Sequence, residues 1–124
     1  MLAVTDPREA YRRSEIDARV EGGADFADLV RLCLEQAISG LGLAIIADER
    51  NDPAARSKAL TRALSAVTAL DMGVERSAPL ARALLQFYGG ARKAILDSVV
   101  TFETQRLATL RQDFVDIAKA LGGS

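Results

Sequence analysis

Apolar residues recur at steps of three and four along four long segments of the chain. This spacing puts them on one side of an α-helix, whereas no segment shows the strict alternation typical of a β-strand. The segments run from about residue 26 to 49, 53 to 72, 78 to 100 and 104 to 121. Because the connections are short, consecutive helices should lie antiparallel. The pattern predicts one all-α domain spanning 1–124, with an antiparallel four-helix bundle at 25–122.

Residues suited to helix ends stand near these limits. Asp25, Asp52 and Ser77 are expected N-caps, because their side-chain oxygens can accept hydrogen bonds from free backbone N–H groups. Pro53 suits a first helical turn, and Gly73 is a plausible stop for the helix that Pro53 begins. The capping residues therefore agree with the hydrophobic pattern on where helices start.

Residues 1–22 are expected to form a short N-terminal helix or arm. A helical stretch is predicted from Pro7 to about Val20, before Gly22-Gly23 interrupts the chain. Its apolar content is thin, so it needs a surface on which to lie. Tyr11 suits such a contact, because its ring can cover apolar surface while its hydroxyl stays hydrated. The arm is therefore a candidate lid over part of the bundle.

The segment from 26 to 49 is apolar over more of its circumference than one helix contact requires. Its first stripe comprises Phe26, Val30, Cys33 and Ala37, and its second comprises Leu34, Ile38, Leu41 and Ile45. Surplus apolar surface marks a partner site, unless the arm around Tyr11 covers it permanently, and the sequence leaves both interpretations open. Gly40 and Gly42 either let another backbone approach closely or simply weaken the helix.

A binding surface follows from these two stripes. The first stripe suffices to face the bundle interior, so we expect the second to line a groove for a guest helix. The small Ala63 on the next segment would let that helix approach closely, while Leu and Ile side chains supply contact area. The predicted partner-binding residues are Tyr11, Leu34, Ile38, Leu41, Ile45, Ala63, Val67 and Leu70.

Composition narrows the class of protein. The chain has 124 residues, a formal net charge of −1 and a single cysteine. That charge gives no overall attraction to nucleic acid or anionic lipid, and no disulfide can form within the chain, which fits a reducing compartment. The N-terminus lacks a signal-peptide pattern, and no uninterrupted apolar run is long enough to insert into a membrane. We therefore expect a cytoplasmic protein with neither nucleic acid nor membrane as partner.

The residues needed for catalysis are sparse. The chain has no histidine, the commonest general base and transition-metal ligand. Cys33 lies on an apolar stripe and is expected to be a buried small hydrophobe, not a nucleophile. The glutamates expected on solvated polar faces are Glu35, Glu49, Glu75 and Glu103. Residues 39–44, SGLGLA, lack the preceding strand and following lysine of a phosphate-binding loop. We therefore expect that the protein is not an enzyme and that it has neither a cofactor site nor a metal site.

Several stretches follow one another in a recognisable order. LVRLCLEQAISGLGLA at 29–44 is similar to the pattern L-[IV]-x-[LM]-L-[YF]-D-G-A-L-x-x-L-x-x-A. Ala10-Tyr11 precedes it, and NDPAARSKALTRALSAVTALD at 51–71 and LARALLQFYGGARKAIL at 80–96 follow it. In order and spacing these stretches resemble the flagellar secretion chaperone (FliS) family. The chain departs from that family at Glu35-Gln36, which replaces Asp-Gly, and by the absence of tryptophan.

This resemblance implies a function. Members of the family hold newly made flagellin in the cytosol, prevent its premature polymerisation and deliver it to the flagellar type III export gate. Their partner is the C-terminal region of flagellin, which is disordered when free and becomes helical on the chaperone, a case of coupled folding and binding. No cofactor is implied.

A second interpretation of the residues stays open. A generic helical adaptor, or a homodimeric scaffold whose surplus apolar face pairs with its own copy, would show the same stripes. A small enzyme is disfavoured, because the chain has no histidine and no clustered catalytic set.

Overall fold

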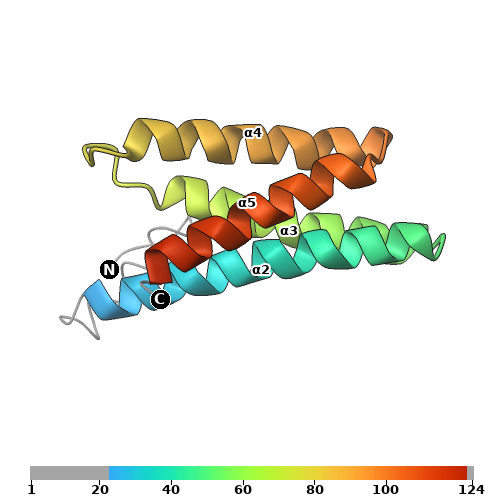
Figure 1. The fold of residues 1–124 in the computed structure, drawn as a ribbon, viewed down its shortest axis with the longest axis horizontal. Coiled ribbons are helices and arrows are strands. Elements are labelled where there is room, and N and C mark those ends of the chain that lie inside the picture. Colours follow the sequence, from blue (N-terminus) through green and yellow to red (C-terminus); the bar gives the residue numbers. More distant parts are fainter. Residues whose placement is uncertain (1–22, 123–124) are drawn as a thin grey trace, which may run out of the picture.

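The fold is seen in a computed structural model that describes residues 23–122 (Figure 1). In this range the chain forms four helices and no strand: α2 (Gly23–Glu49), α3 (Pro53–Met72), α4 (Ala81–Val100) and α5 (Thr104–Gly122). Successive helices alternate in direction, and together they form an antiparallel four-helix bundle. The predicted fold class is confirmed, whereas the predicted arm at 1–22, with Tyr11, lies outside the described residues.

α2 packs against both α3 and α5. α3 also packs against α4, while α4 and α5 have the fewest contacts of the four neighbouring pairs. In Figure 1, α4 and α5 lie close together where residues 101–103 join them, and they diverge toward the opposite end. The bundle is therefore closed at one end and open along the seam between α4 and α5.

A glycine sets the close packing of α2 on α3. A Cβ atom at Gly40 would lie 2.9 Å from the backbone nitrogen of Ala63 and 3.0 Å from the carbonyl oxygen of Ala59. Any side chain there would force the helices apart, so Gly40 permits the close approach of another backbone. Gly42 accommodates a side chain instead: Arg111 of α5 lies over it, and its Nε donates to the carbonyl of Ile38 at 3.2 Å.

Both ends of α3 lie where the sequence predicts them, whereas α2 and α4 start at other residues than predicted. The Asp52 carboxylate accepts a hydrogen bond from Ala55 N at 3.0 Å, as expected of an N-cap. Asp25 is not a cap but lies within the first turn of α2. There its negative charge interacts favourably with the positive N-terminal end of the helix dipole. Ser77 does not cap α4 either, because its hydroxyl donates to Glu75 at 2.9 Å.

Pro79 explains why α4 starts at Ala81 and not at 78. The residue before a proline avoids helical backbone angles, and proline itself has no N–H to donate. The chain instead makes a turn in which Ala81 N donates to the carbonyl of Ala78 at 3.0 Å. This connection is anchored by Val74, which is only 7% exposed.

Candidate partner-binding groove

The two apolar stripes of α2 have different roles from those predicted. Leu34 and Leu41, from the second stripe, are 1% and 0% exposed and belong to the central core. The predicted open groove through the second stripe is therefore wrong at these positions. It is wrong also for Ala63 and Val67 of α3, which are both 0% exposed. The physical reason is that α2 packs against two neighbours, so it needs apolar residues toward α3 and toward α5 at once.

The remaining predicted residues are distributed between core and surface. Ile38 and Ile45 are half-buried and pack against the core, so neither is a free contact surface. Leu70 is buried, yet its side chain lines a cavity described below. Tyr11 lies outside the described residues. The structure thus brings most of the predicted set together, but as interior packing between α2 and α3.

An apolar groove is present at the open end of the bundle. It holds about 200 Å³ and lies between the N-terminal half of α2, the C-terminal end of α3 and the start of α4. Its principal lining residues are Phe26, Val30, Leu70, Val74, Leu84 and Tyr88. Leu121, near the end of α5, borders it and is 58% exposed. We call this cavity the α4–α5 groove, because it lies where these two helices diverge.

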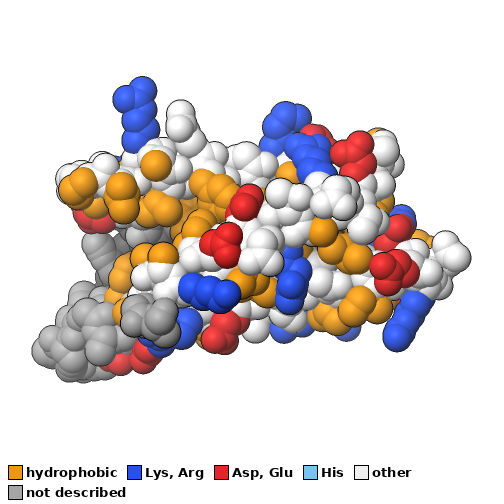
Figure 2. All heavy atoms as spheres, viewed as in Figure 1, with side chains coloured by type: hydrophobic (Ala, Val, Ile, Leu, Met, Phe, Trp, Pro, Cys, Tyr) orange, Lys and Arg blue, Asp and Glu red, His pale blue; other side chains and the backbone are white. Residues whose placement is uncertain are grey.

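The groove is suited to apolar ligands. Figure 2 shows hydrophobic side chains gathered in the gap below α4, toward the open end. Among the described lining residues Glu75 is the one charged side chain, and it stands at the exposed rim. Burying an apolar surface here is favourable, since few polar groups would lose their hydration.

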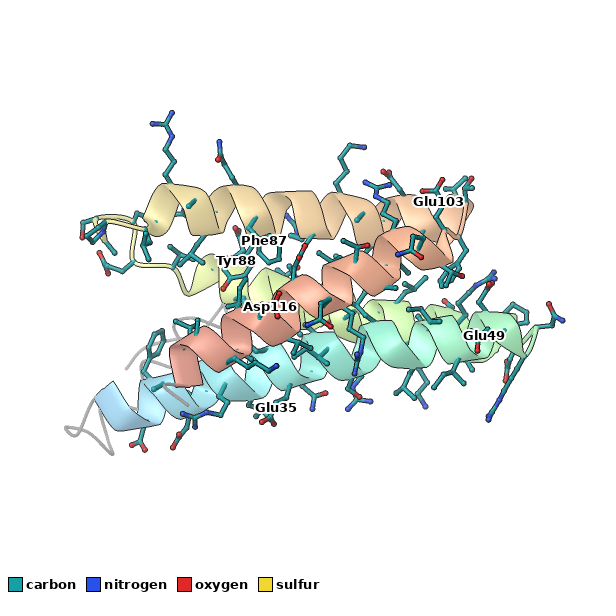
Figure 3. The ribbon with its side chains drawn as sticks, in the orientation of Figure 1. Glu35, Glu49, Phe87, Tyr88, Glu103 and Asp116 are labelled. Atoms are coloured by element: carbon teal, nitrogen blue, oxygen red, sulfur yellow. The ribbon has the colours of Figure 1, made fainter. Side chains whose placement is uncertain are left out.

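Three aromatic rings join α4 to α5, and one of them, Tyr88, also lines the groove. Phe87 and Tyr88 of α4 point toward α5 (Figure 3). The ring of Phe114, on α5, is fully buried and lies 5.0 Å from Phe87 and 6.4 Å from Tyr88, centroid to centroid. Edge-to-face and stacked pairs at these distances add to the stabilisation from burial. The aromatic cluster thus holds together two helices that otherwise touch little.

A charged cluster holds the same two helices at the closed end. The Asp97 carboxylate of α4 accepts hydrogen bonds from Lys93 and from Arg106 of α5, both at 3.1 Å. These two cations lower the pKa of Asp97 below its ordinary value. Because all three side chains are substantially exposed, the cluster contributes orientation more than stability.

Tyr88 joins the groove to the buried thiol. Burial raises the pKa of Tyr88 above its ordinary value, and electrostatic interactions with Asp71 and Cys33 raise it further. Cys33 is buried, with 7% of its surface exposed, as the sequence predicted. Cys33 also forms part of the groove wall. The phenol therefore stays neutral at physiological pH, and Tyr88 adds no charge to the groove lining.

Acidic side chains do not converge on any one place in the described range. Glu35, Glu49 and Glu103 are exposed and lie at separate places on the bundle (Figure 3). No group of three or more His, Cys, Asp or Glu side chains within 23–122 could hold a metal ion. The solvated position predicted for these glutamates is confirmed.

Sequence reasoning missed the groove itself. Its walls include Phe26 and Val30, which the pattern assigned to the interior, and Leu84 and Tyr88 of α4. The divergence of α4 from α5, which opens the groove, has no local signal in the sequence.

Comparisons with known proteins do not assign the chain to a family. No protein-family model matches the sequence, and no curated protein matches it. By length and composition alone, Asp25–Glu49 could cross a membrane, and 33% of its most apolar window is buried inside the bundle. The core helix of a soluble protein has the same length and composition, so this property of α2 is weak evidence for a membrane span.

Proposed function

We propose that this chain is a cytoplasmic export chaperone for flagellin. It holds the C-terminal segment of flagellin, prevents premature polymerisation and delivers it to the flagellar type III export gate. Its activity is binding, not catalysis, and it uses no cofactor. The observation that carries the proposal is the α4–α5 groove, an apolar cavity left by two helices that diverge within a small bundle.

The chemistry of the groove supports a helical protein segment as ligand. Leu84 and Val74 offer aliphatic surface, and Tyr88 adds an aromatic residue to the lining. An amphipathic segment that is disordered when free gains this apolar contact only by folding, so its ordering and its binding are coupled. The motif order at 29–44, 51–71 and 80–96 supports flagellin as the source of that segment.

The predicted arm fits the same mechanism. A lid formed by residues 1–22, with Tyr11 as its contact, would cover apolar surface until flagellin displaces it. Deletion of residues 1 to 20 should then increase binding of a hydrophobic dye and change the affinity for flagellin. Unaltered dye binding and unaltered affinity would contradict the lid.

Calorimetry of the full chain tests the proposed function. The ligand is a synthetic peptide from the C-terminal region of the flagellin encoded in the same genome, and the matched control is a peptide from its N-terminal region. We expect saturable binding of the C-terminal peptide alone, with a gain of helical circular dichroism in the mixture. Absence of binding, or equal binding of both peptides, would contradict the proposal.

A second candidate function has one observation in its favour. The C-terminal end of α4 exposes Leu96, Val99 and Val100, which are 49%, 63% and 88% exposed. Adjacent apolar side chains of this kind favour a contact with another chain, and a homodimeric scaffold is the simplest such assembly. Light scattering after size-exclusion chromatography distinguishes the scaffold from the chaperone. A stable dimer that the Val99→Asp substitution dissociates would support the scaffold.

A further inference from the structure

A second groove lies on the side of the bundle, between the C-terminal half of α2 and the N-terminal half of α3. It holds about 440 Å³. We call it the α2–α3 groove, and its apolar surface comes from Leu43, Ile46, Ala47, Ala55 and Ala59. Leu43 and Ile46 are 44% and 43% exposed, so the core leaves much of their surface free. Figure 2 shows hydrophobic side chains over this half of α2, with a basic side chain near the helix end.

The spacing of the groove residues fits a third helix. On α2 they stand at positions 43, 46 and 47, with Arg50 directly after its last residue, and on α3 they stand at 55, 58, 59 and 62. Both sets follow the i, i+3, i+4, i+7 rule, so each helix turns one continuous face toward the groove. Ala55 and Ala59 are small, which lets a guest helix approach α3 closely while Leu43 and Ile46 contact its apolar stripe.

The rim of the groove is basic. Arg50, Lys58 and Arg62 border it, all are exposed, and within 23–122 none of them forms an ion pair. Arg62 is held in place by a hydrogen bond from its Nε to Gln36 at 2.6 Å. The one acidic residue at the groove, Asp52, already accepts the capping bond of α3. The groove lining therefore carries three cations against one carboxylate, an excess of positive charge.

We propose that the α2–α3 groove binds an amphipathic helix of a partner protein that carries acidic residues beside its apolar stripe. Charge complementarity identifies this occupant: the stripe meets Leu43 and Ile46, and the acidic flanks meet Lys58, Arg62 and Arg50. A concave groove between two helices fits a helix better than the flat surface of a lipid bilayer. This site is separate from the α4–α5 groove, so the proposal stands apart from the flagellin proposal.

Two synthetic peptides of about 18 residues, or five helical turns, serve as probes. Both carry the same Leu/Ala stripe, and their flanks are glutamate in one and lysine in the other. We expect the glutamate peptide to bind the full chain roughly tenfold more tightly at low salt, with the difference shrinking as salt is added. Amide shifts in nuclear magnetic resonance spectra should concentrate on residues 43–62.

Variants of exposed residues decide the site without unfolding the bundle. The double variant Leu43→Gln with Ile46→Gln should bind the glutamate peptide roughly tenfold more weakly. The matched control on α4, Leu96→Gln with Val99→Gln, should bind it with unchanged affinity. Lys58→Glu with Arg62→Glu should reverse the preference toward the lysine peptide. An equal effect of both apolar pairs, or no reversal, would overturn the proposal.

Competing occupants give distinct results. Sedimentation of the chain with phosphatidylserine vesicles, lost in the Lys58→Glu with Arg62→Glu variant, would show that the groove serves a membrane and not a helix. Self-association lost in the Leu43→Gln with Ile46→Gln variant would show that a second copy of the chain occupies it. Either result, without preference for the glutamate peptide, overturns the proposal.

Discussion

Phe87 and Phe114 meet edge to face, with ring centroids 5.0 Å apart and an angle of 63° between the rings. They join α4 to α5, the pair of neighbouring helices with the fewest contacts. Phe114→Ala should therefore lower the free energy of unfolding by about 3–5 kcal/mol, because the buried ring leaves a cavity that this seam cannot refill. Urea denaturation measures the loss. A change below about 1 kcal/mol would show that the seam collapses without the ring.

Glycines in two helices should respond in opposite directions to alanine. A Cβ atom added at Gly89 or Gly90 would meet no atom within 4 Å, so alanine at either site should stabilise the bundle by up to about 1 kcal/mol. Gly40→Ala should instead cost about 1–3 kcal/mol, because the new methyl group meets the backbone of α3. Thermal unfolding of the three single variants gives the comparison. Stabilisation by Gly40→Ala would contradict the close contact between α2 and α3.

Tyr88 should make the bundle lose stability at high pH. Its folded pKa is raised above the ordinary value, first by burial and then by Asp71 and Cys33. The unfolded chain therefore releases the phenolic proton at a lower pH than the folded chain does. The contribution of Tyr88 is full below an unfolded pKa of about 10, and it disappears as the pH rises from there through the folded pKa.

Denaturation midpoints measured between about pH 8 and 11 test this sign, with the range set by the ordinary tyrosine pKa of about 10. Tyr88→Phe removes the titrating group and should flatten the decline. An unchanged alkaline slope in this variant would assign the decline to other residues.

The thiol of Cys33 should react slowly in the folded protein. Only 7% of its surface is exposed, and a buried thiol is inert toward water-soluble reagents. Labelling with an aromatic disulfide reagent should be slow in buffer and fast in guanidinium chloride. A flagellin peptide that fills the α4–α5 groove should slow the reaction further. Rapid stoichiometric labelling of the folded chain would reopen a redox or nucleophilic role.

The sequence predicts the helices well where local rules decide them. The predicted and observed limits of α3 agree at both ends, because Asp52-Pro53 and Gly73 mark these ends through local hydrogen bonding. Ser77 was misleading, since Pro79 displaces the start of α4 past the residue that would be capped. The close contact at Gly40 was one of two interpretations, and only the position of α3 selects it.

The binding surface is harder to predict than the fold. Two apolar stripes on α2 have the same period whether one faces solvent or both face neighbouring helices. Leu34 and Leu41 became core because α2 packs against α5 as well as against α3. The angle between α4 and α5, which creates the α4–α5 groove, arises from the packing of all four helices and has no local motif.

The measurement that tests the central claim most directly compares two aspartate variants in their affinity for the flagellin C-terminal peptide. Leu121 borders the α4–α5 groove and is 58% exposed, whereas Leu96 lies away from it on α4 and is 49% exposed. Both substitutions should leave the thermal midpoint nearly unchanged. Leu121→Asp should weaken peptide binding roughly tenfold or more, because it puts a charge into an apolar contact, and Leu96→Asp should not. Equal affinity of the two variants would contradict binding in this groove.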